Sequence, residues 1–330
     1  MKVALLYNLN RGQSEHETEF DLPITINALT NALSKEHEVI PIECIRDFSC
    51  WITRLVLEKP DIAFNVAEGF VGTAREALYP AICEQLDIMY TGPGPTELLI
   101  CHNKALTKRF LTGSDVPLLW SRLLNFPEEL DFLRVEKVSF PLIVKLNSEG
   151  SSLGLDDHCI VHSWNDLTRQ VEKVWNKYKA GILIEQYVEG IDLSTTFIEG
   201  MGVYGPVQYT YPHGSIYDYR LKSIDNYLVG VINPKDVKPE KIREILELTQ
   251  SIVCQLGMKG YGRADFRLDT NTNQLYLLEM NAQICFHPDG AFVLGVINNS
   301  KYTYDDIVLN IVRYAAENSE RINNSGMRQV

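Results

Sequence analysis

The stretch GRADFRLDTNTNQLYLLEMN, residues 262–281, says most about how this chain folds. Two runs rich in apolar and aromatic residues, 262–268 and 274–280, flank a polar segment, 269–273, whose Asp, Thr and Asn residues favour a turn. This pattern predicts a β-hairpin. Side chains alternate between the two faces of a strand, so every second residue of the hairpin shares a face.

The polar residues of this predicted hairpin can form a metal site. Arg263 and Asp265 share one face of the first strand, and Glu279 and Asn281 share one face of the second. If the strands are neighbours, Asp265, Glu279 and Asn281 converge as hard oxygen ligands for Mg²⁺ and leave room for phosphate oxygens. An acid within LYLLEM is costly unless it is paired or bound to a metal. The alternative for Glu279 is a salt bridge to a buried arginine.

The composition of the whole chain is that of a globular protein. It has 330 residues, 45% of them hydrophobic, and its 43 acidic against 31 basic side chains give a formal charge of −12. This length suggests two or three domains. Nucleic acid is not expected as a partner, because binding to a phosphate backbone needs a concentrated basic face.

The cysteines and the N-terminus indicate where the protein works. The seven cysteines show no CxxC spacing, and their odd number rules out complete pairing, so a reduced, cytoplasmic setting is expected. The first apolar run has five residues, fewer than the roughly 7 to 15 of a secretory signal or the about 20 of a membrane helix. We therefore expect no membrane partner.

Alternating strands and helices predict an α/β fold. Residues 1–97 are expected to form a small α/β domain with a parallel sheet, with strands at 3–7, 37–42, 60–66 and 87–91 and helices at 21–34 and 75–85. One long helix is expected from Thr96 to near Gly113. Later elements are expected at 141–146, 164–178, 181–186, 194–199, 205–212 and 238–256.

The loop NSEGSSLG, residues 147–154, follows a predicted strand that ends in Lys145. Small residues let backbone N–H groups and hydroxyls close around phosphate oxygens, while a lysine adds a point charge. An isolated run of this type is more often a flexible surface turn. The loop is therefore interpreted together with the other motifs of the sequence.

Together, these motifs resemble the ATP-grasp ligases, and among them the D-alanine–D-alanine ligases and their relatives. The matching segments are YTGPGP (90–95), HNKALTKRFL (102–111), FPLIVKLNSEGSSLGL (140–155), ILIEQYVEGIDLS (182–194), GSIYDYRLK (214–222), GYGRADF (260–266) and LLEMN (277–281). The resemblance implies an ATP-grasp fold of α/β (α+β) class. It would have an N-terminal Rossmann-like domain of pre-ATP-grasp type over 1–97, a central lid domain over 98–187 and a C-terminal domain over 188–330 with the metal and catalytic site.

The resemblance also implies a role for each motif residue. The nucleotide-binding set would be Lys104 and Lys145 at the α- and β-phosphates, Ser151 and Ser152 in the loop over the phosphates, Glu185, Gln186, Tyr187 and Val188 at the adenine, Asp192 at the ribose and Lys222 at the γ-phosphate. The catalytic set would be Arg263, which stabilises the oxyanion of the tetrahedral intermediate, with Lys222, Ser151 and Glu19. Two Mg²⁺ ions would be held by Asp265, Glu279 and Asn281.

Departures from the family pattern lie on the amino-acid side of the site. Glu68 stands where the family has a histidine, Ser223 where it has a tyrosine, and Gly290 about where it has a serine that grips the acceptor carboxylate. The expected substrate-binding residues are Glu68, His287, Asp289 and Gly290. Glu68 is equally well read as a solvated loop residue, and His287 as a satisfied loop imidazole; His102 is expected on a helix surface. Of Glu15, Glu17, Glu19 and Asp21, Glu19 is preferred for binding the donor's ammonium group.

Three functions remain in competition. The leading one is an ADP-forming carboxylate–amine ligase with small amino-acid-like substrates and an altered pocket, and the second is a D-alanine–D-alanine ligase of cell-wall synthesis. A non-catalytic ATP-binding module is less favoured, because the seven residues expected to handle phosphate, metal and oxyanion are all present: Lys104, Lys145, Lys222, Arg263, Asp265, Glu279 and Asn281. We also expect a homodimer.

Overall fold

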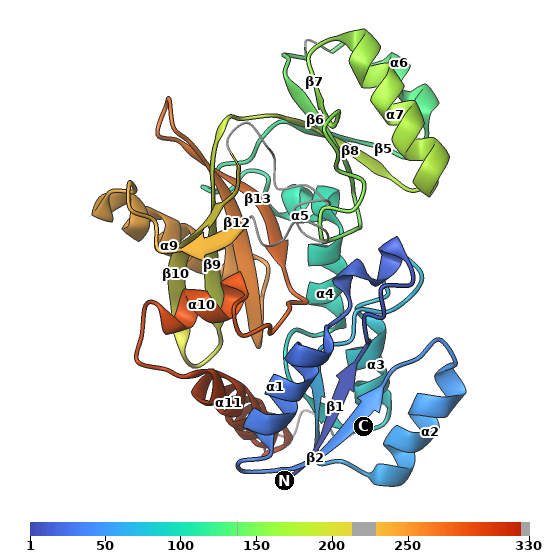
Figure 1. Cartoon of the computed structure of the whole chain (residues 1–330), viewed down its shortest axis with the longest axis vertical. Coiled ribbons are helices and arrows are strands. Elements are labelled where there is room, and N and C mark those ends of the chain that lie inside the picture. Colours follow the sequence, from blue (N-terminus) through green and yellow to red (C-terminus); the bar gives the residue numbers. More distant parts are fainter. Residues whose placement is uncertain (137, 213–228, 325–330) are drawn as a thin grey trace.

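The computed structural model describes residues 1–136, 138–212 and 229–324 (Figure 1). Three sheets, each with its own helices, are arranged along the long axis of the molecule, as Figure 1 shows. Each sheet falls within one of the three segments expected from the sequence, while the division at residues 97 and 187 stays a prediction. No helix among the described residues is long and apolar enough to span a membrane.

The first sheet is parallel, as expected, with the order β2-β1-β3-β4. Its strands are β1 Lys2–Tyr7, β2 Glu38–Glu43, β3 Ile62–Asn65 and β4 Met89–Tyr90. The segments before and between these strands hold η1 Glu15–Glu19, α1 Pro23–Leu33, α2 Phe48–Glu58 and α3 Leu78–Gln85. Helix α2 was not expected; Asp47 caps its first turn by accepting a hydrogen bond from the Ser49 amide.

The expected single helix from Thr96 is wrong, because the chain forms two. They are α4 Pro95–His102 and α5 Lys104–Leu111. Asn103 between them is extended, and its side chain accepts a hydrogen bond from the Leu106 amide at 2.9 Å. An asparagine that caps a new helix ends the previous one, and this break places Lys104 in the first turn of α5.

The second sheet is antiparallel, with the order β5-β8-β6-β7. Its strands are β5 Ser121–Leu124, β6 Leu142–Leu146, β7 Ile160–Val161 and β8 Ile182–Gln186. Its helices are η2 Pro127–Glu129, α6 Leu130–Leu133 and α7 Trp164–Tyr178. Helix α7 has the expected bounds and packs its apolar face on this sheet, where Leu167, Val171 and Val174 join the core.

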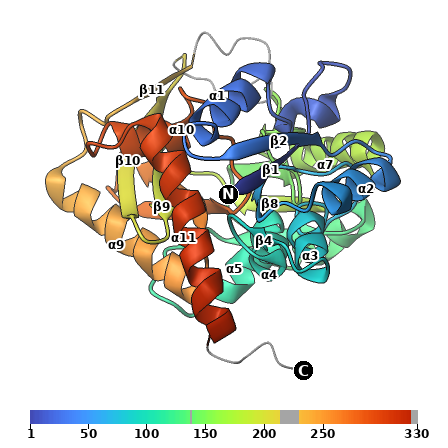
Figure 2. The same ribbon diagram turned by 90° about the horizontal axis from the view of Figure 1, so that it is seen from below.

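The third sheet is also antiparallel, with the order β11-β10-β9-β12-β13. Its strands are β9 Gly190–Ile198, β10 Gly202–Thr210, β11 Gly230–Ile232, β12 Tyr261–Asp269 and β13 Leu275–Asn281. Its helices are α9 Pro239–Gln255, α10 Ala291–Ile297 and α11 Tyr304–Asn324. Helix α11, which was not expected, packs against α1, β3 and β4 of the first sheet (Figure 2). The C-terminal helix therefore joins the first and third parts of the molecule through one shared core.

Candidate active site

A pocket lies between the second and third sheets, beside the start of α5. It is lined by twelve of the residues predicted to form the site: Lys104, Lys145, Ser151, Ser152, Glu185, Gln186, Tyr187, Val188, Asp192, Arg263, Asp265 and Glu279. Segments far apart in the sequence thus meet around one space. Lys222 and Ser223 lie outside the residues that the structure describes.

A buried ion cluster forms the side of the pocket made by β6 and β8. Glu185, whose side chain is 1% exposed, accepts from the Lys145 ammonium at 2.5 Å and pairs with Lys108 through its other oxygen. Burial alone would raise the pKa of Glu185, but the two ammonium groups outweigh it and the pKa is lowered. Two cations against one anion leave the cluster with a net positive charge, which suits a phosphate.

The predicted hairpin of β12 and β13 is confirmed. Asp265 lies directly opposite Glu279, and Arg263 lies opposite Asn281. Arg263 donates two hydrogen bonds to Asp265, at 2.8 and 2.7 Å, and the Asn281 amide donates a third at 2.9 Å. Glu279 pairs with Lys104 at 3.3 Å.

This hairpin offers a suitable set of ligands for a hard cation. No cluster of three or more His, Cys, Asp or Glu side chains that could hold a metal is found among the described residues. The hairpin instead presents two opposed carboxylates and an amide, all oxygen donors, beside the positively charged cluster. Two carboxylates with substrate phosphates is the usual donor set of Mg²⁺, so these residues fit Mg²⁺.

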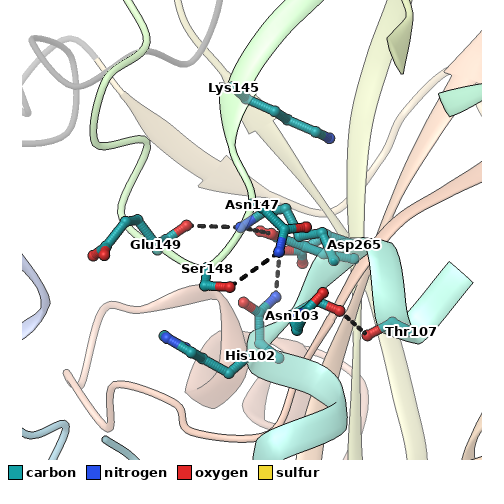
Figure 3. A network of polar contacts seen from close by, with 12 residues as sticks. His102, Asn103, Thr107, Lys145, Asn147, Ser148, Glu149 and Asp265 are labelled. Carbon is teal, nitrogen blue, oxygen red and sulfur yellow. Dashed lines mark hydrogen bonds and ion pairs between the residues drawn. The ribbon is translucent and has the colours of Figure 1, made fainter. Parts of the chain in front are cut away.

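The loop 147–154 covers the pocket and is held by the start of α5. The Asn147 side chain accepts from the Ala105 amide at 2.9 Å, and the Lys104 ammonium donates to the Glu149 carbonyl at 2.7 Å. Figure 3 shows Asn147 and Ser148 close to Asn103 at the junction of α4 and α5. Ser151 and Ser152 have φ angles of +47° and +57°, which are uncommon for serine and turn the loop over the pocket.

A second polar cluster ties this loop to the first part of the molecule. Arg75 pairs with Glu19 at 2.5 Å and with Glu149 at 3.1 Å, and it contacts His102 Nε2 at 2.9 Å. Glu19 in turn accepts from the Gly150 amide at 2.5 Å. Glu19, the acid preferred for the donor's ammonium group, therefore contacts the backbone of the loop.

His102 is buried, and the expectation of a helix-surface residue is wrong. Its Nδ1 lies 2.5 Å from Glu76, on the opposite side from Arg75. Since a guanidinium only donates, Nε2 must accept and the ring proton must be on Nδ1. His102 is thus a neutral imidazole that links Arg75 to Glu76.

The four residues predicted to bind the amino-acid substrate do not line the pocket. Glu68 is buried, not solvated, and burial together with Glu76 and Glu19 raises its pKa well above the usual range. His287, Asp289 and Gly290 share one turn before α10, in which the Asp289 amide donates to His287 Nδ1 at 3.1 Å and the Gly290 amide donates to the His287 carbonyl at 2.8 Å. Their role in binding stays a prediction.

Sequence reasoning missed Lys108 and Arg75 in these clusters, and it also missed Arg267 and Tyr211, which line the pocket. Two of them carried a usable signal. Arg267 follows Asp265 by two positions in GRADFR, so strand alternation puts it on the same face, and Lys108 follows Lys104 by one helical turn. Arg75 and Tyr211 carried no usable signal in the sequence, because their partners are distant along the chain.

A pocket between two antiparallel sheets, lined by lysines, carboxylates and a small-residue loop, defines an ATP-grasp enzyme. Comparison with known proteins supports this class: the family model described as D-ala D-ala ligase C-terminus matches residues 123–313. A D-alanine–D-alanine ligase of Aquifex aeolicus is 30% identical over 285 residues, which cover 85% of this chain and 89% of that protein. The chain belongs to the D-alanine–D-alanine ligase family.

Further relatives share the fold over nearly the whole chain. A D-alanine–D-alanine ligase of Carboxydothermus hydrogenoformans is 25% identical over 300 residues, which cover 88% of this chain and 91% of that protein. The crystal structure of D-alanine–D-alanine ligase from Bacillus anthracis matches with a TM-score of 0.79 at 19% identity, covering 98% of this chain and 99% of that one. The crystal structure of D-alanyl-alanine synthetase A from Vibrio cholerae matches with a TM-score of 0.77 at 20% identity. This match covers 96% of this chain and 98% of that one. The expected fold class is confirmed, and the protein is an ADP-forming ATP-grasp ligase with ATP and Mg²⁺ as its cofactors.

Proposed function

We propose that this ligase joins the carboxylate of one amino acid to the amine of a second, in two steps. The donor carboxylate attacks the γ-phosphorus of ATP, which gives an acylphosphate and ADP. The amine then attacks the acyl carbon, phosphate leaves, and an amide forms with the loss of a proton. The observation that carries this proposal is the pocket beneath loop 147–154, which is lined by two lysines, Lys104 and Lys145, and by the two opposed carboxylates of the hairpin.

The residues around this pocket have separate tasks in the proposed reaction. Lys104 and Lys145 neutralise phosphate charge, with Lys145 held in place by Glu185. Asp265, Glu279 and Asn281 would hold Mg²⁺, which when bound neutralises the oxygens of the β- and γ-phosphates. The loop with Ser151 and Ser152 keeps water from the acylphosphate. The assignments of Gln186, Tyr187 and Val188 to adenine and of Lys222 to the γ-phosphate belong to the same proposal.

Arg263 is suited to the oxyanion of the second step. Its guanidinium is always charged and makes two hydrogen bonds with Asp265, so its orientation is set before substrate binds. A donor fixed in advance loses little free energy to reorganisation when negative charge develops on the carbonyl oxygen. The resemblance implies that this oxygen would lie beside Arg263.

The amino-acid side is proposed to differ from that of a dedicated D-alanine–D-alanine ligase. Glu68 is buried among Glu19, Glu76 and Asp21, whereas Gly290 offers no hydroxyl to an acceptor carboxylate. Loss of a hydrogen bond to a charged group costs on the order of 1.5 to 3 kcal/mol, or roughly tenfold to a hundredfold in discrimination. We therefore expect weak ligation of D-alanine to itself and a preference for larger or differently charged substrates.

The second candidate, ligation of two D-alanine molecules, is favoured by the names of the curated relatives. An ADP-release assay separates the two: D-alanine alone is compared with pairs drawn from neutral, acidic and basic amino acids of both hands. Efficient release with D-alanine alone would establish the second candidate and remove the altered pocket. A homodimer is part of the proposal, and light scattering of the purified chain tests it.

A further inference from the structure

Arg267 lies in the wall of the pocket and binds four residues from three segments of the chain. From β12, its Nε donates to the Val188 carbonyl at 2.9 Å, and its Nη1 donates to Asp192 at 2.7 Å and to the Tyr211 hydroxyl at 3.2 Å. Its Nη2 lies 3.3 Å from the Tyr187 hydroxyl. The side chain is 9% exposed, so these contacts are largely shielded from water.

Both oxygens of Asp192 are fixed by this arrangement. Asp192 and Arg267 are direct partners across β9 and β12, so one oxygen accepts from the guanidinium. The other accepts from the Tyr211 hydroxyl at 2.5 Å. Burial and the neighbouring Asp192 raise the pKa of Tyr211, so this hydroxyl keeps its proton and remains a donor. A carboxylate oxygen has two lone pairs, which leaves capacity on each oxygen for a further donor from the pocket.

Arg267 also holds the linker between the second and third sheets. Residues 187–189 connect the end of β8 to the start of β9, and Arg267 binds the Val188 carbonyl and lies over the Tyr187 ring at 5.7 Å. One side chain thus sets the distance between the linker, where a base would contact the backbone, and Asp192. Removal of the Arg267 side chain would therefore free both the linker and Asp192.

We propose that Arg267 is a positioning residue for the nucleotide. It holds the Asp192 carboxylate aimed at the ribose hydroxyls, and so it sets the preference for ATP over deoxyribose analogues. This inference rests on the proposed function, in which the pocket binds ATP and Asp192 meets the ribose. A purely structural salt bridge would affect all nucleotides alike, whereas a positioning residue affects those with the hydroxyl that Asp192 contacts.

The test compares binding of MgATP, Mg-2′-deoxyATP and Mg-3′-deoxyATP by calorimetry, without amino acids, to the wild type and to Arg267→Met, Arg267→Lys and Tyr211→Phe. We expect the wild type to prefer ATP over at least one deoxy analogue by about tenfold, the worth of one hydrogen bond to a charged acceptor. In Arg267→Met, the affinities for ATP and for this analogue should differ by no more than about twofold, mainly because ATP binds more weakly. Arg267→Lys should restore part of the ratio, and Tyr211→Phe should lower it partly.

Kinetics and a control complete the experiment. Once a substrate pair is known, Arg267→Met should raise the KM for ATP about tenfold while kcat stays within about twofold. Arg169→Met removes an arginine from the exposed face of α7, away from the pocket. This variant should change neither the KM for ATP nor kcat. If Arg267→Met does not fold, the conservative Arg267→Lys and Tyr211→Phe variants decide the matter.

The outcomes separate this inference from the proposed function. The positioning role is overturned if the ratio of the affinities for ATP and its deoxy analogue in a folded Arg267→Met or Tyr211→Phe variant equals that of the wild type. The proposed binding of ATP would remain. Tight ATP binding without any preference for the ribose hydroxyls removes Asp192 as a ribose ligand, and with it this inference. Absence of ATP binding by the wild type contradicts the proposed function itself.

Discussion

Replacing Lys108 with Met tests whether the buried cluster with Glu185 and Lys145 stabilises the site as argued. Lys108 and Glu185 have side chains that are 8% and 1% exposed, and they lie on α5 and β8. The methionine keeps most of the volume of the lysine stem and removes its charge. Glu185 then retains only Lys145, which lines the pocket.

The expected loss is about 3 kcal/mol in the free energy of unfolding. Two unit charges about 3 Å apart attract by roughly 5 to 6 kcal/mol at an effective dielectric constant of about 20. Desolvation offsets much of this in an intact pair, but removing one partner leaves the other charge buried, which costs about 3 to 5 kcal/mol. The lower end applies because Lys145 remains beside Glu185.

Urea unfolding followed by tryptophan fluorescence measures this loss, since Trp164 and Trp175 lie on α7, which packs on the sheet that contains Glu185. The matched control is Lys173→Met, which breaks an exposed pair with Asp156 and should cost no more than about 1 kcal/mol. The double variant Lys108→Met/Glu185→Gln should be more stable than the sum of the single effects by about 2 kcal/mol. A loss below about 1 kcal/mol in Lys108→Met, or strict additivity in the double variant, would refute the reasoning.

Three further changes probe the rest of the site. Glu279→Gln should abolish ADP formation at ordinary Mg²⁺ while circular dichroism stays unchanged; near-normal turnover would remove Glu279 from the metal site. Arg263→Ala should lower kcat by about a hundredfold or more with ATP affinity nearly unchanged, whereas an equal loss of affinity would make Arg263 a nucleotide ligand. Burial raises the pKa of Asp21 to about 7, so the folded protein keeps a proton that the unfolded chain releases from about pH 4 upward, and stability falls between those values. Asp21→Asn should therefore gain stability over wild type by up to about 1.4 kcal/mol per pH unit from pH 4 to 7, as measured by urea unfolding; a gain independent of pH would contradict this.

What could be predicted from the sequence was governed by local patterns. The hairpin of β12 and β13 follows from two-residue alternation and a polar turn, so Asp265 and Glu279 could be placed opposite each other in advance. The helix break at Asn103 carried a local signal that was overlooked, because apolar spacing continues across it while the asparagine caps a new helix. The burial of His102 carried none, since it depends on Arg75, 27 residues earlier in the chain.

The difference between the two sides of the site also has a physical basis. On the proposed nucleotide side, these carboxylates have cationic partners inside the protein: Glu185 has Lys108 and Lys145, Asp265 has Arg263, and Asp192 has Arg267.

On the proposed amino-acid side, Glu19 and Glu76 lie near Arg75, and Glu68 and Asp21 lie near each other. The neutral His102 adds no charge. Burial raises the pKa of Glu68 and of Asp21, which is the usual response of a carboxyl that is taken out of water. A substrate that brings a positive charge to these acids would allow them to ionise, and its binding would release protons. The affinity for the amino acid should then increase as the pH rises through neutrality. The nucleotide side, where these carboxylates already have cationic partners, has no reason to share this dependence.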